Sequence, residues 1–198
     1  MRILLIIMAV LVVLFTISQI YGPMFGGTEE QAYSVVQRYD ELEIRHYPQA
    51  LMASVDVPDS AYRSASGTGF RRLAGYIFGD NETGEKIAMT APVHMGMEEG
   101  SMRMSFVMPA ERAQEPMPDP VDSGVQLHVA AEEFVAVLRF GGFLRDAEMT
   151  DMKAKLLAEL ERNGLVPIGP VRFLGYDPPW QLVGRRNEVV VPVRWPQP

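Results

Sequence analysis

The predicted secondary structure of this chain repeats one order of elements, and that repetition constrains the fold more than any single motif does. In the first half, a strand over 50–57 precedes a helix over 60–77 and strands over 86–93 and 102–108. The second half gives the same order, at 134–140, 146–163, 171–176 and 188–193. Such self-similarity indicates a duplicated supersecondary unit. We therefore predict two β-α-β-β units that enclose an apolar groove, with the helices on its flank.

Local residue patterns support these assignments. Residues 41–47 alternate between apolar and charged side chains, which is typical of a half-buried strand. The first helix carries four apolar residues at helical spacing: Phe70, Leu73, Ala74 and Ile77. Pro92 and Pro179 mark equivalent strand exits in the two halves, where a residue without an amide donor is tolerated.

The first 21 residues differ in composition from the rest of the chain. A near-continuous apolar run follows Arg2, and its extension to Tyr21 gives about the length that a bilayer requires. The run over 1–21 favours a signal anchor or a cleaved signal peptide, although a buried core helix has the same pattern. Residues 22–32 are then a linker, and the folded domain is expected over 33–195. Because the basic residue precedes the run, the domain is expected outside the cytoplasm, in the periplasm of a bacterium.

Charge and cysteine content exclude several classes of function. The formal net charge is −7, whereas nucleic-acid binding requires clustered Lys and Arg. The chain has no cysteine, which excludes disulfides, thiolate ligation of haem, covalent haem attachment and thiol nucleophiles. The abundant methionines, 13 in all, suit either ordinary core filling or a pocket wall that adapts to varied apolar shapes.

The three histidines do not have the spacing of a zinc site. His46 shares a predicted strand face with Leu42 and Ile44, so we expect it to point inward. It is then either a hydrogen-bonded core histidine or a weak candidate for an axial iron ligand. Strand alternation predicts that His94 is partly exposed and that His128 is solvated.

Six segments, in order and at compatible spacing, carry a resemblance to the SOUL haem-binding protein family over 33–193. They are EIRHYP (43–48), FRRLAGYIFG (70–79), KIAMTAPV (86–93), FVMP (106–109), VAVLRF (135–140) and YDPPW with RRNE (176–180 and 185–188). The resemblance implies an α+β fold, a distorted antiparallel β-barrel built from two β-α-β-β repeats with two flanking helices. It also implies likeness to GyrI-like ligand-binding domains.

The resemblance further implies reversible, non-covalent binding of haem or a related tetrapyrrole as cofactor, without catalysis. The family's apolar slot corresponds here to these residues: Phe70, Leu73, Ala74 and Ile77 on the first helix, and Pro179, Trp180 and Leu182 after the Asp-Pro-Pro turn. Arg71 and Arg72 are the expected partners of the haem propionates, because guanidinium pairs with carboxylate at two points. Gln181 stands where some relatives have a basic residue, which weakens the expectation for haem itself.

Three alternatives remain open from the sequence. A methionine-lined groove in an acidic protein suits another lipophilic or cationic small molecule as well as it suits haem. A small-molecule hydrolase of the GyrI-like kind would require a groove carboxylate with a raised pKa. A purely structural or partner-binding protein would fill the groove with its own side chains.

Overall fold

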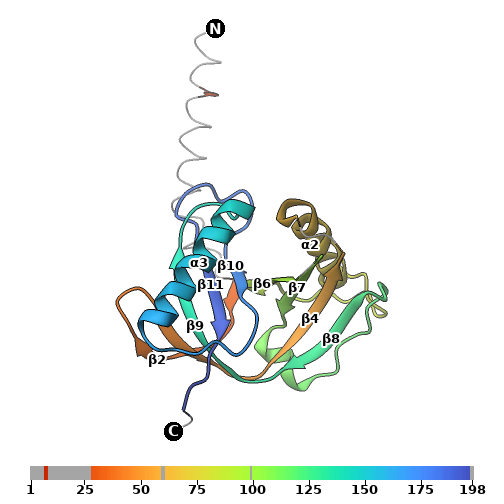
Figure 1. Cartoon of the computed structure of the whole chain (residues 1–198). Coiled ribbons are helices and arrows are strands. Elements are labelled where there is room, and N and C mark those ends of the chain that lie inside the picture. Colours follow the sequence, from red (N-terminus) through yellow and green to blue (C-terminus); the bar gives the residue numbers. More distant parts are fainter. Residues whose placement is uncertain (1–6, 9–27, 59–60, 99, 197–198) are drawn as a thin grey trace.

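The computed structural model describes residues 7–8, 28–58, 61–98 and 100–196, and it contains two long helices and a large antiparallel sheet (Figure 1). The helices are α2 (Tyr62–Phe78) and α3 (Asp146–Arg162), and η1 (Ala110–Gln114) is a short 3-10 helix. The strands are β1 (Glu29–Glu30), β2 (Ser34–Arg38), β3 (Glu43–Tyr47), β4 (Ala50–Val57), β5 (Thr90–Ala91), β6 (Val93–Glu98), β7 (Ser101–Val107), β8 (Val125–Ala130), β9 (Glu133–Phe140), β10 (Arg172–Gly175) and β11 (Asn187–Pro192).

The sheet topology displays the predicted duplication. The nine-stranded sheet has the order β2-β3-β9-β11-β10-β6-β7-β4-β8. Within each β-α-β-β unit, the last strand lies between the first and the second, which gives β4-β7-β6 in one unit and β9-β11-β10 in the other. The two units join where β6 pairs antiparallel with β10. Each unit therefore contributes three strands to one continuous sheet, and β2, β3 and β8 extend it at the two ends.

The sheet is a curled half-barrel, which corrects the expectation of a barrel. Within the described residues, the end strands β2 and β8 pair only with β3 and β4, so the sheet does not close. Both helices lie on its concave face (Figure 1). The physical reason for the open sheet is that α2 and α3, instead of a further strand pairing, cover the concave apolar face.

The main core lies between the concave face and the two helices. Helix α2 contributes Leu73 and Ile77, which are 0% exposed, and α3 contributes Leu156 and Leu160. Gly69 brings α2 close to β7, because a Cβ at this position would lie 3.2 Å from the Met104 Cβ. The helix ranges predicted from apolar spacing agree with the observed ones to within two residues.

The convex face holds a smaller apolar cluster and a buried polar network. Val135 and Val137 of β9 lie in this cluster, whereas Ala136 and Leu138 lie in the main core. Residues 135–138 are therefore buried on both faces of the sheet. Beside the cluster, the fully buried Glu188 carboxylate accepts hydrogen bonds from Arg45, Arg186 and Tyr176.

Two predicted boundaries differ from the structure. The strand expected over 86–93 is displaced, because β6 begins at Val93 after Pro92 and continues to Glu98. Glu29 and Glu30, which the sequence placed in a linker, pair with β5, so the fold begins before residue 33. In the described part of the chain no helix is both long and apolar enough to cross a membrane. Apart from Ile7 and Met8, the predicted anchor over 1–21 lies outside the described residues.

Candidate functional site

The two helices begin at the same end of the molecule, and the β10–β11 loop (176–186) lies beside them; we call this the apical end (Figure 1). The Tyr62 amide at the start of α2 donates to Asp146 Oδ1 at the start of α3, with an N–O distance of 3.0 Å. Burial raises the pKa of the Tyr62 hydroxyl, while the Arg185 charge of the loop acts in the opposite direction. These contacts bring the loop and both helix starts together.

The β10–β11 loop is held in one shape by Arg185. Its guanidinium donates to the carbonyl oxygens of Asp177, Pro178 and Gln181, at 3.0, 2.7 and 2.8 Å. The Gln181 side chain is buried and donates to the Val183 carbonyl, which explains why a polar residue follows Trp180. In the sequence, Arg185 and Arg186 were recognised only as part of a family motif. The residue pattern of the loop did not predict that Arg185 would donate hydrogen bonds to the loop carbonyls.

The braced loop points its apolar side chains outward. Trp180 is 70% exposed and Leu182 is 52% exposed. Pro179, the third predicted site residue of the loop, is also exposed. A large apolar side chain that stays in water forfeits about 1.5–3 kcal/mol of burial energy. The fixed loop therefore displays apolar side chains to solvent at the apical end.

On α2, the residues predicted to line the slot divide into two groups. Leu73 and Ile77 are completely buried under the helix and support it from the sheet side. Phe70 and Ala74 lie on a side of the helix that is partly open to solvent, which we call the α2 flank. Phe70 is 36% exposed, and its ring packs edge-on against Phe106 with 5.3 Å between the ring centroids. The surface that a ligand can reach is therefore this flank and not the Leu73–Ile77 stripe.

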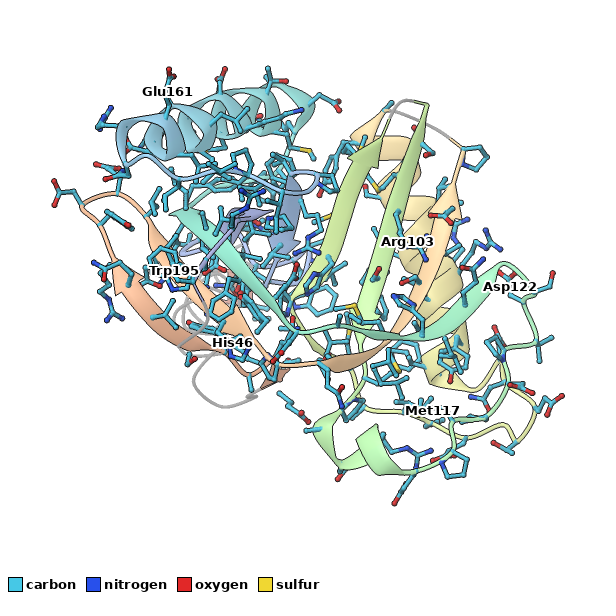
Figure 2. The ribbon with its side chains drawn as sticks, turned by 60° about the horizontal axis from the view of Figure 1, so that its bottom comes forward. His46, Arg103, Met117, Asp122, Glu161 and Trp195 are labelled. Atoms are coloured by element: carbon cyan, nitrogen blue, oxygen red, sulfur yellow. The ribbon has the colours of Figure 1, made fainter. Side chains whose placement is uncertain are left out.

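The two predicted propionate partners also differ. Arg72 donates to both oxygens of Asp122, at 2.6 and 2.7 Å, and its guanidinium occupies the space where Gly124 lacks a Cβ. This ion pair lowers the pKa of Asp122 to about 2. Asp122 precedes β8, on the side of α2 away from α3 (Figure 2). Arg71 lies on the exposed outer face of α2.

His46 lies away from the apical end. It pairs with Phe134 of β9, whereas Phe140 at the other end of β9 pairs with Asn187, next to the loop. At about 3.4 Å per residue, this places His46 roughly 20 Å from the start of β11. Its ring is tilted against that of Phe134, with 4.8 Å between the ring centroids, and its Nε2 atom lies 3.2 Å from Glu132 Oε2.

His46 lines a hollow of about 570 Å³ together with Phe134 and Trp195. Figure 2 labels His46 and Trp195, which lie near each other in that view. A second hollow, of about 430 Å³, lies on the convex side and is lined by Arg38, Arg139 and neighbouring carboxylates. Among the described residues, no group of three His, Asp or Glu side chains is placed to hold a metal ion.

The prediction for His94 was wrong. The side chain is only 7% exposed, and its Nε2 lies 2.8 Å from Gln31 Oε1. Burial, with a smaller contribution from the Arg172 charge, lowers the pKa of His94 to about 3. The reason for the error is that the segment before residue 33 covers this face of β6, which strand alternation alone does not reveal.

The buried network of the convex face also shifts pKa values. Burial opposes charge on Arg45, yet the Glu188 carboxylate at 2.8 Å more than offsets it and raises the pKa of Arg45. Burial, together with nearby Tyr47 and Glu188, raises the pKa of Tyr176. The β11 strand that follows the loop is thereby fixed by charge pairing on one face and apolar packing on the other.

Comparison with known proteins identifies relatives of the chain. The family described as SOUL heme-binding protein matches residues 28–192. Heme-binding protein 2 of Mus musculus is 37% identical over 155 residues, which cover 74% of this chain and 75% of that protein. Heme-binding protein 1 of Sus scrofa is 26% identical over 184 residues, covering 87% and 97%.

Solved structures with the same fold are more distant in sequence. The EcmrR C-terminal domain has a TM-score of 0.59 at 12% identity, covering 82% of this chain and 98% of that one. A hydrolase from Listeria innocua has a TM-score of 0.54 at 12% identity, covering 90% and 98%. Likeness at this identity establishes the fold alone.

Proposed function

The chain belongs to the SOUL heme-binding protein family, and we propose that it binds haem or a related tetrapyrrole reversibly and without a covalent bond. The observation that supports this location is the braced β10–β11 loop, which displays Trp180 and Leu182 and whose Arg185 lies near Tyr62 at the start of α2. The absence of cysteine from the sequence is consistent with non-covalent binding.

We place the macrocycle between the α2 flank and the loop. Phe70 and Ala74 offer an apolar surface on the helix side, and Trp180 and Leu182 offer one on the loop side. Tetrapyrrole sites are apolar with a few polar groups that fix orientation. Offset stacking of the Trp180 indole on the ring would supply favourable aromatic contact.

The propionates are assigned to Arg71 in preference to Arg72. Recruitment of Arg72 would break its two-point pairing with Asp122. Arg71 is exposed on the same helix, and its long side chain can reach over the apical surface. An arginine–carboxylate pair in this setting is screened by solvent, so we expect it to orient the ligand more than to hold it.

Two locations for bound haem differ in whether His46 can ligate the iron. At the α2 flank a macrocycle would lie too far from His46 for ligation, so bound haem would lack that axial ligand. The hollow at His46 is the second candidate location, because Phe134 and Trp195 are aromatic and Glu132 can orient the imidazole. The substitution His46→Ala tests the choice: unchanged haem absorption supports the α2 flank, and a shifted band supports the hollow.

We also propose that 1–21 anchors the chain in a membrane, with the domain outside the cytoplasm. The support is the apolar run of the sequence and the acidic residues that follow it. The relatives are named as heme-binding proteins, which favours binding over catalysis. A GyrI-like module for another lipophilic or cationic molecule, or a small-molecule hydrolase, is the alternative that ligand tests must exclude.

Haemin titration of the chain in mild detergent tests the proposal. Saturable, near-stoichiometric binding with a shifted Soret band is the expected result. Haemin binding no stronger than that of a generic apolar protein, together with strong binding of a lipophilic cation, would contradict it. The double substitution Trp180→Ala with Leu182→Ala should weaken haemin binding, whereas Val121→Ala, an exposed site beyond α2, is the matched control.

A further inference from the structure

Four exposed apolar side chains gather at the apical end: Phe143, Trp180, Leu182 and Val183, which we call the apical apolar surface. Their exposed fractions are 40%, 70%, 52% and 64%. Arg185 connects them, because its guanidinium lies 4.8 Å from the centre of the Phe143 ring while it braces the loop that carries the other three. Exposed apolar clusters of this kind mark interaction surfaces.

From this surface we propose that the domain docks its apical end into the interface of a lipid bilayer. In the ligand-free domain Trp180, Leu182 and Val183 enter the headgroup region, and the opposite end of the domain faces water. Tryptophan favours this depth because its ring is apolar while its N–H can remain hydrated. Fixed bracing of the loop lowers the entropy cost of docking, since the side chains are already displayed.

The path of the chain identifies the bilayer as the occupant. The apolar run predicted to enter the membrane ends at Tyr21, and the first described strand contains Glu30. Glu30 is ion-paired with Arg186 at the base of the loop, with an N–O distance of 2.9 Å. The short segment between them spans at most roughly 30 Å when extended. The predicted anchor would therefore join the domain at its apical end.

The charges around the surface indicate which force drives docking. Three cations lie beside it: Arg145, Arg185 and Arg186. Three carboxylates lie next to them: Asp146, Asp177 and Glu30. Opposite charges balance there, so we expect apolar insertion and no requirement for anionic lipid. If the tetrapyrrole site is where we propose, its mouth then opens at the bilayer surface, and a lipophilic ligand reaches it from the membrane.

The two tryptophans provide a matched pair of probes, because they flank opposite ends of β11. Trp180 precedes the strand in the loop, and Trp195 follows it at the other end. The full chain is reconstituted without haem into phosphatidylcholine vesicles, as the single-tryptophan variants Trp195→Phe and Trp180→Phe. Brominated lipid, which quenches tryptophan within the bilayer, should remove about half of the Trp180 emission and leave the Trp195 emission unchanged.

A second variant keeps the test independent of the tryptophan itself. In the Trp195→Phe background, Leu182→Asp with Val183→Asp should abolish the quenching, with the fold verified by circular dichroism. Equal quenching of both tryptophans, no quenching of Trp180, or quenching that survives the two aspartates would overturn the proposal. Because haem is absent, these results are separate from the haemin titration, and either proposal can fail alone.

Discussion

The two β-α-β-β units share one topology but differ in the connection between their last two strands. In the first unit, β6 and β7 are joined by residues 99–100 alone. In the second unit, the equivalent connection between β10 and β11 is the braced loop 176–186. The duplicated scaffold therefore supplies a stable curved sheet twice, whereas the candidate binding surface arises from one elongated loop.

The convex faces of the two units also differ. Glu188 of β11 is surrounded by guanidinium and hydroxyl groups, and Ser105 of β7 makes a hydrogen bond of 2.7 Å with Ser54. Charged side chains are thus buried on the convex face of the unit that carries the loop. We interpret this network as the support that fixes the start of β11, and hence the base of the loop.

The largest expected effect comes from the substitution Glu188→Ala. It leaves Arg45 and Arg186 without their shared carboxylate, and loss of one partner from a buried pair costs about 3–5 kcal/mol. Ser105→Ala, the matched change in the first unit, should cost about 1 kcal/mol. Urea unfolding measures both, and equal losses would show that the network has no special role in the second unit.

The next effect concerns pH and the buried His94 of the first unit. Its pKa is about 3 in the folded chain, below the ordinary value of 6.5, so the unfolded chain binds the extra proton between these values. Stability therefore decreases as pH falls through this window, by about 2 kcal/mol between pH 7 and pH 5. His94→Gln should reduce this dependence. An unchanged dependence in the His94 variant would contradict the assignment.

A smaller effect is expected from the loop itself. The double change Trp180→Ala with Leu182→Ala removes exposed side chains, so the free energy of unfolding should be unchanged within about 0.5 kcal/mol. Haemin affinity should nevertheless fall by about tenfold, since the removed area would be buried by the ligand. A loss of stability without loss of affinity would mean that the loop serves the scaffold only.

The smallest effect distinguishes the two adjacent arginines of α2. Arg71→Ala should weaken haemin binding by about threefold, as expected for a solvent-screened ion pair. Arg72→Ala should leave haemin affinity unchanged, because its guanidinium is already paired with Asp122. If haemin titration shows a larger loss of affinity for Arg72→Ala than for Arg71→Ala, the propionates are bound on the β8 side of α2.

The helix ranges and the duplicated order of elements were predictable from the sequence, because each helix and strand is assigned from the pattern of residues near one another in the chain. The stripe of Leu73 and Ile77 identified the buried face of α2 correctly, but it does not reveal which flank remains open. The open sheet and the burial of His94 depend on long-range contacts, such as that between Gln31 and β6. The role of Arg185 was missed because it bonds to backbone carbonyls, which carry no sequence signal.

The most direct test of the account is amide hydrogen exchange of the chain with and without haemin. Binding between the α2 flank and the loop predicts added protection confined to residues 62–74 and 176–186. Protection centred instead on 34–46 and 132–134, around the His46 hollow, would contradict the proposed site while leaving haem binding intact.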